Sequence, residues 1–271
     1  MCIFIAYFFY KTKNMRRRGG LKIRLLIGAG IILFSLFKYY SNRGTNPYTG
    51  KKQSIELTAD QEIAIGLQSA PQMAQQHGGL YPSQQAQDLV DEIGEKLIDN
   101  SIAKETPYRY DFHLLRDPEA INAFALPGGQ IFITYALFEK LENEDQLAGV
   151  LGHEIGHVVG RHSAERIAKQ GLTQGIISGV LVGADSGAGQ MAAMIANVVN
   201  MKYGRGDELE SDDLGVKFMI DAGYQPEEMI GVMKILKTAA GPNRTPEFQS
   251  THPDPENRIE KIKEAIQKYS K

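Results

Sequence analysis

The stretch LGHEIGHVVGRH, from Leu151 to His162, contains three of the six histidines in a chain of 271 residues. On a helix, residues four apart lie on one face, so His153 and His157 can direct two imidazole nitrogens at one ion. Glu154 follows the first histidine and lies beside that ion, where it can accept a proton from a metal-activated water. The H-E-x-x-H spacing therefore predicts a buried helical metal site with Glu154 as general base.

A third ligand is needed, because catalytic zinc sites have three protein ligands and keep one position for water. His162 is near in sequence, but the pattern H-E-x-x-H-x-x-G-x-x-H places its third histidine one position later, at Ser163. His162 falls on a different angular face of the helix. We interpret it as a cation near a helix C-terminus.

A carboxylate from a later helix is the other common third ligand. The run RGDELESDDLG, residues 205–215, offers Asp207, Glu208, Glu210, Asp212 and Asp213. Spacing alone does not choose among them. Glu208 and Asp212 are four residues apart, so one can bind the metal while the other orients a ligand histidine. A solvated acidic face is the alternative, and the residues favour neither interpretation.

Four separated motifs resemble one family of zinc metallopeptidases, which includes HtpX, BepA, LoiP, the Oma-type mitochondrial protease and the CAAX prenyl endopeptidase. The first is the stretch NAFALPGGQIFITYALFEKLENEDQLAGVLGHEIGHVVGRHS, residues 122–163. The family's R-x-x-E-x-x-A-D helix and T-H-P-x-x-x-x-R turn are met by Arg205, Glu208, Ser211 and Asp212, and by Thr251, His252, Pro253 and Arg258. The segment NPYTGKKQSIELTADQEIAIGLQ is similar to the region before the domain in LoiP-type and Oma-type members, the single-anchor proteins that the chain resembles most. Serine in place of alanine at position 211 is the one departure.

The resemblance implies a complete site with one zinc ion per chain. Glu208 becomes the third ligand beside His153 and His157, and Asp212 orients a ligand histidine. His252 becomes the residue that steadies the oxyanion or gates the site, and Arg205 is a second candidate for stabilising charge in the transition state. An extended peptide is expected to pair with an edge strand that contains Gly129, Gln130, Ile131 and Phe132.

A basic head and an apolar run precede the domain. The run from Leu25 to Phe37 is uncharged but shorter than the roughly 20 residues of a bilayer span. Flanking basic and aromatic side chains can extend it toward the headgroups. We interpret residues 21–40 as a membrane anchor rather than a core helix or a cleaved signal peptide, since KYYSNRG offers no small-residue cleavage site. Residues 1–20 form the head, within which residues 1–14 are interpreted as a start-site artefact before Met15.

The positive-inside rule leaves this head in the cytoplasm and sends the rest of the chain across the membrane. The expected location is the bacterial inner membrane, single-pass, with the catalytic domain on the periplasmic side. The mitochondrial inner membrane is the alternative. A head without Ser disfavours a transit peptide.

Residues 41–56 are rich in Gly, Asn, Pro and Ser and predict a linker, and residues 57–271 predict one zinc metallopeptidase domain. Its expected fold class is α+β, a mostly helical zincin-like domain around a small antiparallel sheet. Capping signals begin helices at Thr58 and Ser83. Alternating apolar residues predict strands over 108–115, 121–126 and 129–134. Helical segments follow: one long helix over 144–170, two core helices within 171–200, and three more within 207–223, 226–241 and 255–270.

Composition excludes several classes. The formal net charge of −2 leaves no basic excess for nucleic acid, and the single cysteine, Cys2, excludes disulfides and cysteine-ligated metal from the domain. The sequence therefore predicts a membrane-anchored, zinc-dependent endopeptidase for misfolded or envelope proteins, whose partners are protein or peptide substrates. A zinc-stabilised envelope chaperone or adaptor with little proteolysis is the rival. Oligomeric state is not encoded in these patterns.

Overall fold

The computed structural model describes residues 2–184, 203–239, 247–252 and 257–270. The chain divides into two compact units. We call one the helical unit, made of Met1–Gly44, Ser54–Glu56 and Ile167–Val198, and the other the sheet unit, made of Thr45–Gln53, Leu57–Arg166 and Val199–Lys271. The architecture is mostly helical with two small sheets, which confirms the α+β prediction.

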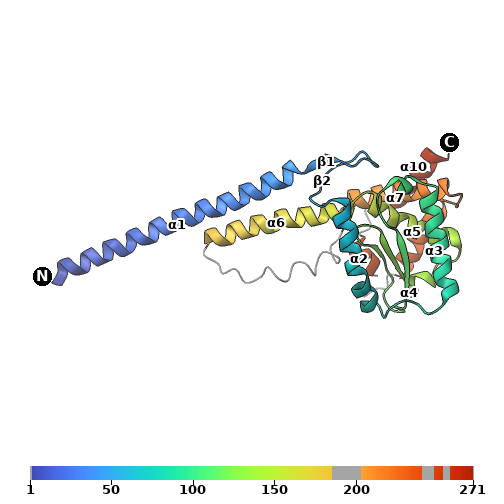
Figure 1. Cartoon of the computed structure of the whole chain (residues 1–271), viewed down its shortest axis with the longest axis horizontal. Coiled ribbons are helices and arrows are strands. Elements are labelled where there is room, and N and C mark those ends of the chain that lie inside the picture. The colour runs from blue at the N-terminus through green and yellow to red at the C-terminus, as the bar shows by residue number, and fades with distance from the viewer. Residues whose placement is uncertain (1, 185–202, 240–246, 253–256, 271) are drawn as a thin grey trace. The chain divides into compact units, whose positions relative to one another are not determined.

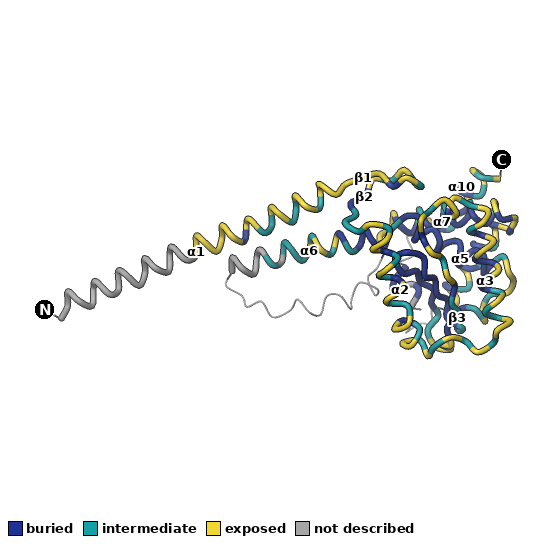
Figure 2. The backbone as a smooth tube through the Cα atoms, viewed as in Figure 1, coloured by how far each residue is buried: buried dark blue, intermediate teal, exposed yellow. Residues whose placement is uncertain are grey.

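The helical unit is built on α1 (Cys2–Ser41) and most of α6 (His162–Ala184), which contact each other where Gly175 packs against Ser35. From residue 21 onward, where burial is described, α1 is mostly exposed (Figure 2). Its large apolar side chains are among the exposed ones, and Leu26 is 73% exposed. They are Leu21, Ile23, Leu25, Leu26, Ile27, Leu33, Phe34 and Phe37. Among the described residues, no helix meets the length and hydropathy expected of a transmembrane span.

The remaining elements of Figure 1 lie in the sheet unit, except that β1 and β2 cross the boundary between the two units. In chain order they are β1 (Arg43–Thr45), β2 (Lys52–Ser54), α2 (Ala59–Gln76), α3 (Gln84–Asp99), the 3₁₀ helix η1 (Ile102–Glu105), β3 (Asp111–Leu115), β4 (Ala123–Ala125), β5 (Gln130–Thr134), α4 (Tyr135–Phe138), α5 (Glu144–Val159), α7 (Arg205–Asp221), α8 (Glu228–Ala239), α9 (Glu247–Thr251) and α10 (Arg258–Tyr269).

Three helices begin at side-chain caps, and the sequence predicts two of these caps, Thr58 and Ser83. Thr58 and Gln61 form a capping box on α2, in which each side chain bonds the backbone of the other residue. Ser83 caps α3 and Asn143 caps α5, each by accepting a hydrogen bond from a first-turn backbone N–H. Local sequence therefore fixes where these helices start.

The three-stranded sheet is mixed, not antiparallel as predicted. β4 pairs antiparallel with β5, but β3 pairs parallel with β5. The short turn at Pro127 and Gly128 makes β4 and β5 a hairpin, whereas the longer connection from β3 lets β5 insert beside β3 in the same direction. Alternation predicted the strands but carried no information on their order.

The strand order β3-β5-β4 also corrects the predicted substrate edge. β5, which contains Gln130, Ile131 and Phe132 and follows Gly129, lies in the middle of the sheet. Its backbone groups bond to strands on both sides, so no peptide can be added there. The edge strands are β3 and β4.

Helix α5 is the centre of the sheet unit and packs against α3, α7, α8 and β4. The closest approach is to α7, where a Cβ added at Gly156 would lie 2.9 Å from the carbonyl oxygen of Ser211. Only a residue without a side chain permits two helix backbones to come this near. This contact brings the acidic run of α7 onto the histidine face of α5.

The predicted helix over 144–170 is broken in two. α5 ends at Val159 and α6 begins at His162, because Arg161 between them has a left-handed backbone with φ +57°. The first of the two core helices predicted within 171–200 is instead the continuation of α6 to Ala184. The second falls outside the described residues.

The segment predicted as a linker, 41–56, is partly folded into the sheet unit. Asn46 and Gln53 are buried, and their side-chain amides donate hydrogen bonds to the carbonyl oxygens of Val159 and Gly160, each at 2.9 Å. These carbonyls end α5 and have no helical partner of their own. The segment therefore caps the histidine helix.

Candidate metal centre

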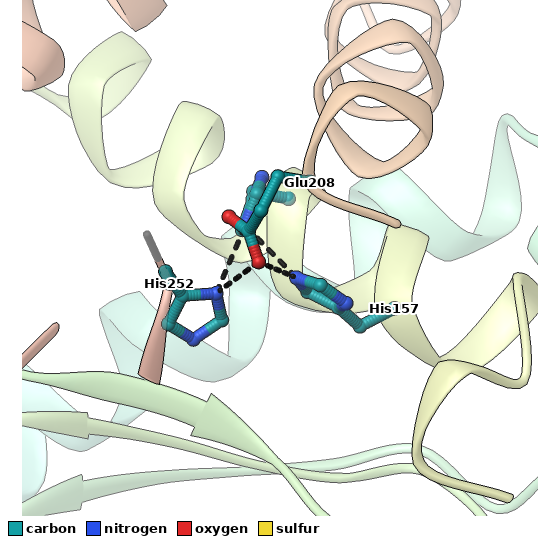
Figure 3. A group of neighbouring side chains, drawn as sticks. His157, Glu208 and His252 are labelled. Atoms are coloured by element: carbon teal, nitrogen blue, oxygen red, sulfur yellow. Dashed lines mark hydrogen bonds and ion pairs between the residues drawn. The ribbon is translucent and has the colours of Figure 1, made fainter. Parts of the chain in front are cut away.

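Four side chains from three parts of the sheet unit converge. α5 supplies His153 and His157, α7 supplies Glu208, and His252 follows the end of α9. Figure 3 shows the Glu208 carboxylate directed between the rings of His157 and His252. All four side chains are buried. We call these residues the inner cluster.

The donor atoms of the inner cluster have the spacing that a metal ion requires. A tetrahedral zinc with bonds of about 2.0–2.1 Å keeps its donors about 3.3 Å apart. The Nε2 atoms of His153 and His157 are 3.0 Å apart, and each lies 3.5 Å from an oxygen of Glu208. Imidazole and carboxylate are also the ligand types that zinc prefers. The three residues fit a zinc ion.

Unsatisfied atoms point to the same conclusion. Within the described residues, Glu208 Oε2, His252 Nε2 and both oxygens of Glu154 are buried without a hydrogen-bond partner. A buried polar atom without a partner costs free energy and is rare in native proteins. Of these atoms, Glu208 Oε2 lies 3.5 Å from His153 Nε2, and a cation held by the inner cluster would satisfy it.

His252 occupies the fourth corner of the group. Its Nδ1 atom lies 3.3 Å from His153 Nε2 and 3.2 Å from Glu208 Oε1. Catalytic zinc sites reserve that corner for water. Its ring is stacked on Phe248, with centroids 4.4 Å apart, and lies near Tyr203. The described arrangement is therefore closed to a water ligand.

His153 is held by a carboxylate and a guanidinium. Its Nδ1 lies 2.8 Å from Asp212 Oδ1, and Arg258 Nε donates to Asp212 Oδ2 at 2.6 Å. Burial opposes protonation of His153, but the hydrogen bonds to Asp212 and Glu208 outweigh it and raise its pKa to about 9. Burial likewise opposes ionisation of Asp212, but Arg258 and His153 hold its pKa below the usual range. The Nε2 atom of His153 stays directed into the cluster.

His157 has different neighbours. Its Nδ1 lies 2.9 Å from Nδ1 of His162, and its ring is stacked on Tyr203 with centroids 3.8 Å apart. Burial, followed by the charge of His153, lowers the pKa of His157 well below its usual value. His157 is therefore neutral, the form that binds metal.

Glu154 lies beside the cluster and is fully buried. Its Oε1 is 3.6 Å from His252 Nε2. Burial raises its pKa above the usual value for a glutamate, against the opposing charges of His252 and His153. A carboxylate with a raised pKa is a stronger base, which suits a group that must take a proton from water.

The two arginines of the family motifs lie in different environments. Arg205 is exposed in the first turn of α7, so its predicted role in stabilising the transition state gains no support from its placement. Arg258 is the buried guanidinium instead, with Nη1 3.4 Å from Glu208 Oε2 as well as its bonds to Asp212. The T-H-P-x-x-x-x-R motif contained Arg258, but spacing assigned it no partner. Pro253 of that motif lies outside the described residues.

The interpretation of His162 as a cation near a helix C-terminus is wrong. It is the first residue of α6, is fully buried and belongs to a second group with Asp207 and Glu210, which we call the outer cluster. Lys51 Nζ lies 2.7 Å from Asp207 and 2.9 Å from Glu210. His162 Nε2 lies 2.9 Å from the same Glu210 oxygen.

Comparisons with known proteins show which family the chain matches. The profile of peptidase family M48 matches residues 83–266. The beta-barrel assembly-enhancing proteases of Yersinia pestis and Escherichia coli (strain K12) are each 30% identical to the chain over 79% of its length, but the matched regions cover 45% and 46% of those relatives. The mitochondrial metalloendopeptidase OMA1 of Schizosaccharomyces pombe is 28% identical over 89% of the chain and 69% of its own length. The chain thus spans just under half the length of the bacterial relatives.

Proposed function

This chain belongs to peptidase family M48, and we propose that it is a membrane-anchored, zinc-dependent endopeptidase of zincin-like fold that cleaves misfolded or envelope proteins. One observation carries the proposal. The Nε2 atoms of His153 and His157 and the carboxylate of Glu208 converge at the spacing of a tetrahedral ion, with buried Glu154 beside them. Each chain would hold one zinc ion on these three residues.

The chemistry divides between the metal and the chain. Bound zinc supplies a Lewis acid that polarises the scissile carbonyl and lowers the pKa of a water molecule. Glu154 takes the proton of the attacking water and delivers it to the leaving amine. Asp212 accepts from His153 Nδ1–H and so keeps Nε2 of that ring free for the metal. His252, once displaced from the fourth corner, is near enough to Glu154 to steady the oxyanion.

Substrate must enter where α9 now lies. Phe248 of α9 donates its backbone N–H to the carbonyl oxygen of Ile121, just before edge strand β4 (Ala123–Ala125). An extended peptide bound at this edge would make the same kind of backbone hydrogen bond. We therefore assign β4 as the strand that pairs with substrate, and expect α9 and His252 to move away together when a peptide binds.

Residues 21–40 are proposed as the membrane anchor, between a cytoplasmic head and a translocated catalytic domain. The support is the row of exposed apolar side chains on α1, preceded by Arg16, Arg17 and Arg18. The bacterial inner membrane is the proposed location, with the mitochondrial inner membrane as the alternative. Protease added outside intact spheroplasts should digest the domain. Protection until lysis would show that the orientation is reversed.

Proteolysis itself is tested on the purified full-length chain with casein, an unstructured substrate. Cleavage should stop when zinc is chelated and return when zinc is restored. The rival function, a zinc-stabilised chaperone or adaptor, predicts that the zinc-loaded protein suppresses aggregation of a denatured client without cutting casein. Intact Glu154 favours the protease, because a holding protein needs no general base.

A further inference from the structure

His162 is folded back onto the helix that precedes it. Arg161 takes the left-handed backbone conformation that reverses the chain between α5 and α6. Gly160 leaves room for the returning ring, because a Cβ added there would lie only 2.6 Å from His162 Cε1. His162 has no exposed surface. The local sequence Gly-Arg-His thus places an imidazole against His157.

The ring is the middle member of a chain of polar contacts. His157 Nδ1 and His162 Nδ1 are 2.9 Å apart, and His162 Nε2 lies 2.9 Å from Glu210 Oε2. Lys51 Nζ contacts that same oxygen at 2.9 Å and fixes it from the other side. This series of contacts therefore connects the inner cluster to the carboxylate of Glu210, which Lys51 holds in place.

The direction of each hydrogen bond in this series follows from Glu210, its last member. A carboxylate only accepts, so the hydrogen between His162 and Glu210 is on His162 Nε2. In a neutral imidazole the other nitrogen is then an acceptor, and His162 Nδ1 receives the hydrogen of His157 Nδ1. This leaves Nε2 of His157 with a free lone pair, directed at His153 and Glu208. Glu210 thereby sets the tautomers of two rings in series.

We propose that His162, held by Glu210, is the positioning residue of His157: it fixes the ring's orientation and keeps it in the tautomer that binds metal. This inference rests on the proposed role of His157 as a zinc ligand. His153 is held by a carboxylate directly, through Asp212. His157 is held by a carboxylate only indirectly, because the imidazole of His162 lies between His157 and Glu210. Loss of such an orienting partner typically lowers metal affinity by about 10- to 100-fold.

Substitutions at position 162 separate hydrogen bonding from packing. His162→Leu fills much of the space but accepts no hydrogen bond. His162→Asn places an amide oxygen near the former Nδ1, where it can still accept from His157. The probe is zinc itself, titrated into the full-length protein against a competing chelator, with the absorption spectrum of the Co²⁺ form as a second readout. Leucine should weaken zinc binding by about 10- to 100-fold and shift the Co²⁺ bands, whereas asparagine should stay within about threefold of wild type.

Glu210→Ala tests the outer end of this series of contacts while keeping the His162 ring. It should weaken zinc binding by about threefold to tenfold, a smaller effect because His162 itself remains. Asp207→Ala is its matched control. Asp207 shares Lys51 with Glu210 but bonds the backbone of Gly204 rather than His162, so this variant should bind zinc as wild type does.

Two results would overturn the positioning role: wild-type zinc affinity in His162→Leu, or equal weakening by leucine and asparagine. His157→Ala keeps this failure separate from that of the proposed function. If His157→Ala loses zinc while His162→Leu keeps it, only the positioning role fails. If His157→Ala itself keeps zinc, His157 is not a ligand and the proposed site is wrong.

Discussion

The inner and outer clusters have similar donors but satisfy them differently. Each contains histidine and carboxylate atoms within 4.8 Å of one another. In the outer cluster, the Lys51 ammonium lies between Asp207 and Glu210 and serves as their cation. In the inner cluster, the guanidinium of Arg258 bonds mainly Asp212 and lies 3.4 Å from Glu208 Oε2, which is buried without a hydrogen-bond partner among the described residues. Donor composition therefore does not identify a metal site. What identifies it is whether the protein supplies its own cation.

The largest expected effect is loss of metal from the inner cluster alone. His157→Ala and Glu208→Ala each remove one of three ligands and should leave almost no zinc on the chain after gel filtration. Asp207→Ala, the matched change in the outer cluster, should keep one zinc per chain. Metal analysis of the three proteins measures this. Full zinc in Glu208→Ala, or zinc lost from Asp207→Ala, would reverse the assignment of the two clusters.

The second effect separates binding from chemistry within the inner cluster. Glu154→Gln has nearly the same shape, so it should keep the zinc and the fold. It loses the proton acceptor, and such groups contribute roughly a hundredfold to ten-thousandfold to rate. Casein turnover is measured beside zinc content. A zinc-replete variant that cuts at the wild-type rate would exclude Glu154 as the general base.

These two clusters also show how far the sequence could predict the site. The H-E-x-x-H spacing predicts where His153, Glu154 and His157 lie on one helix. The choice of Glu208 among five acids needed the family resemblance, because it depends on how α7 approaches α5 at Gly156. Helical periodicity could not reveal this contact between distant segments.

Corrections to the fold have similar causes. The turn at Gly160 and Arg161 is invisible to an apolar pattern that continues on both sides of it, so His162 was assigned to the wrong environment. The strands were predicted from alternation, but alternation says nothing about neighbours, and β5 proved to be central rather than an edge. Short-range patterns predicted elements, and long-range packing decided their roles.

The third effect is a pH dependence confined to the inner cluster. Without metal, His153 holds a proton with a pKa of about 9, and zinc must displace it. Apparent zinc affinity should therefore rise about tenfold per pH unit up to about pH 9. By the same linkage, the proton on His153 stabilises the zinc-free protein. This contribution to the free energy of unfolding is complete below pH 6.5, the ordinary pKa of histidine, and is lost as the pH rises through 9. Chelator competition from pH 6 to 9 measures the affinity, and a flat profile would contradict the assignment.

The fourth effect concerns the closed corner of the inner cluster. His252→Ala removes the ring that takes the place of the catalytic water. If displacement of His252 limits access, casein cleavage by the zinc-loaded variant should rise severalfold, because less of the protein is in the closed form. If oxyanion support is its larger role, the rate should fall instead. Turnover at saturating substrate decides between the two roles.

The smallest effect tests whether the outer cluster is an ion-pair network that stabilises the fold. Burial opposes ionisation of Glu210, but His162 and Lys51 outweigh it and lower its pKa to about 2. Because the pKa of Glu210 is lower in the folded protein, its ionised carboxylate adds to the free energy of unfolding. This contribution is complete above pH 4.5, the pKa in the unfolded chain, and is lost as the pH falls toward 2. Glu210→Gln, compared with wild type in the zinc-free state, should lower the free energy of unfolding by at most a few kcal/mol at pH 7, and the difference should shrink between pH 4.5 and 2.

Asp213→Asn is the control on the same helix, because its pair with Lys268 is exposed and should contribute less than about 1 kcal/mol. Equal effects of the two variants at pH 7 would show that the outer cluster behaves as an ordinary surface pair.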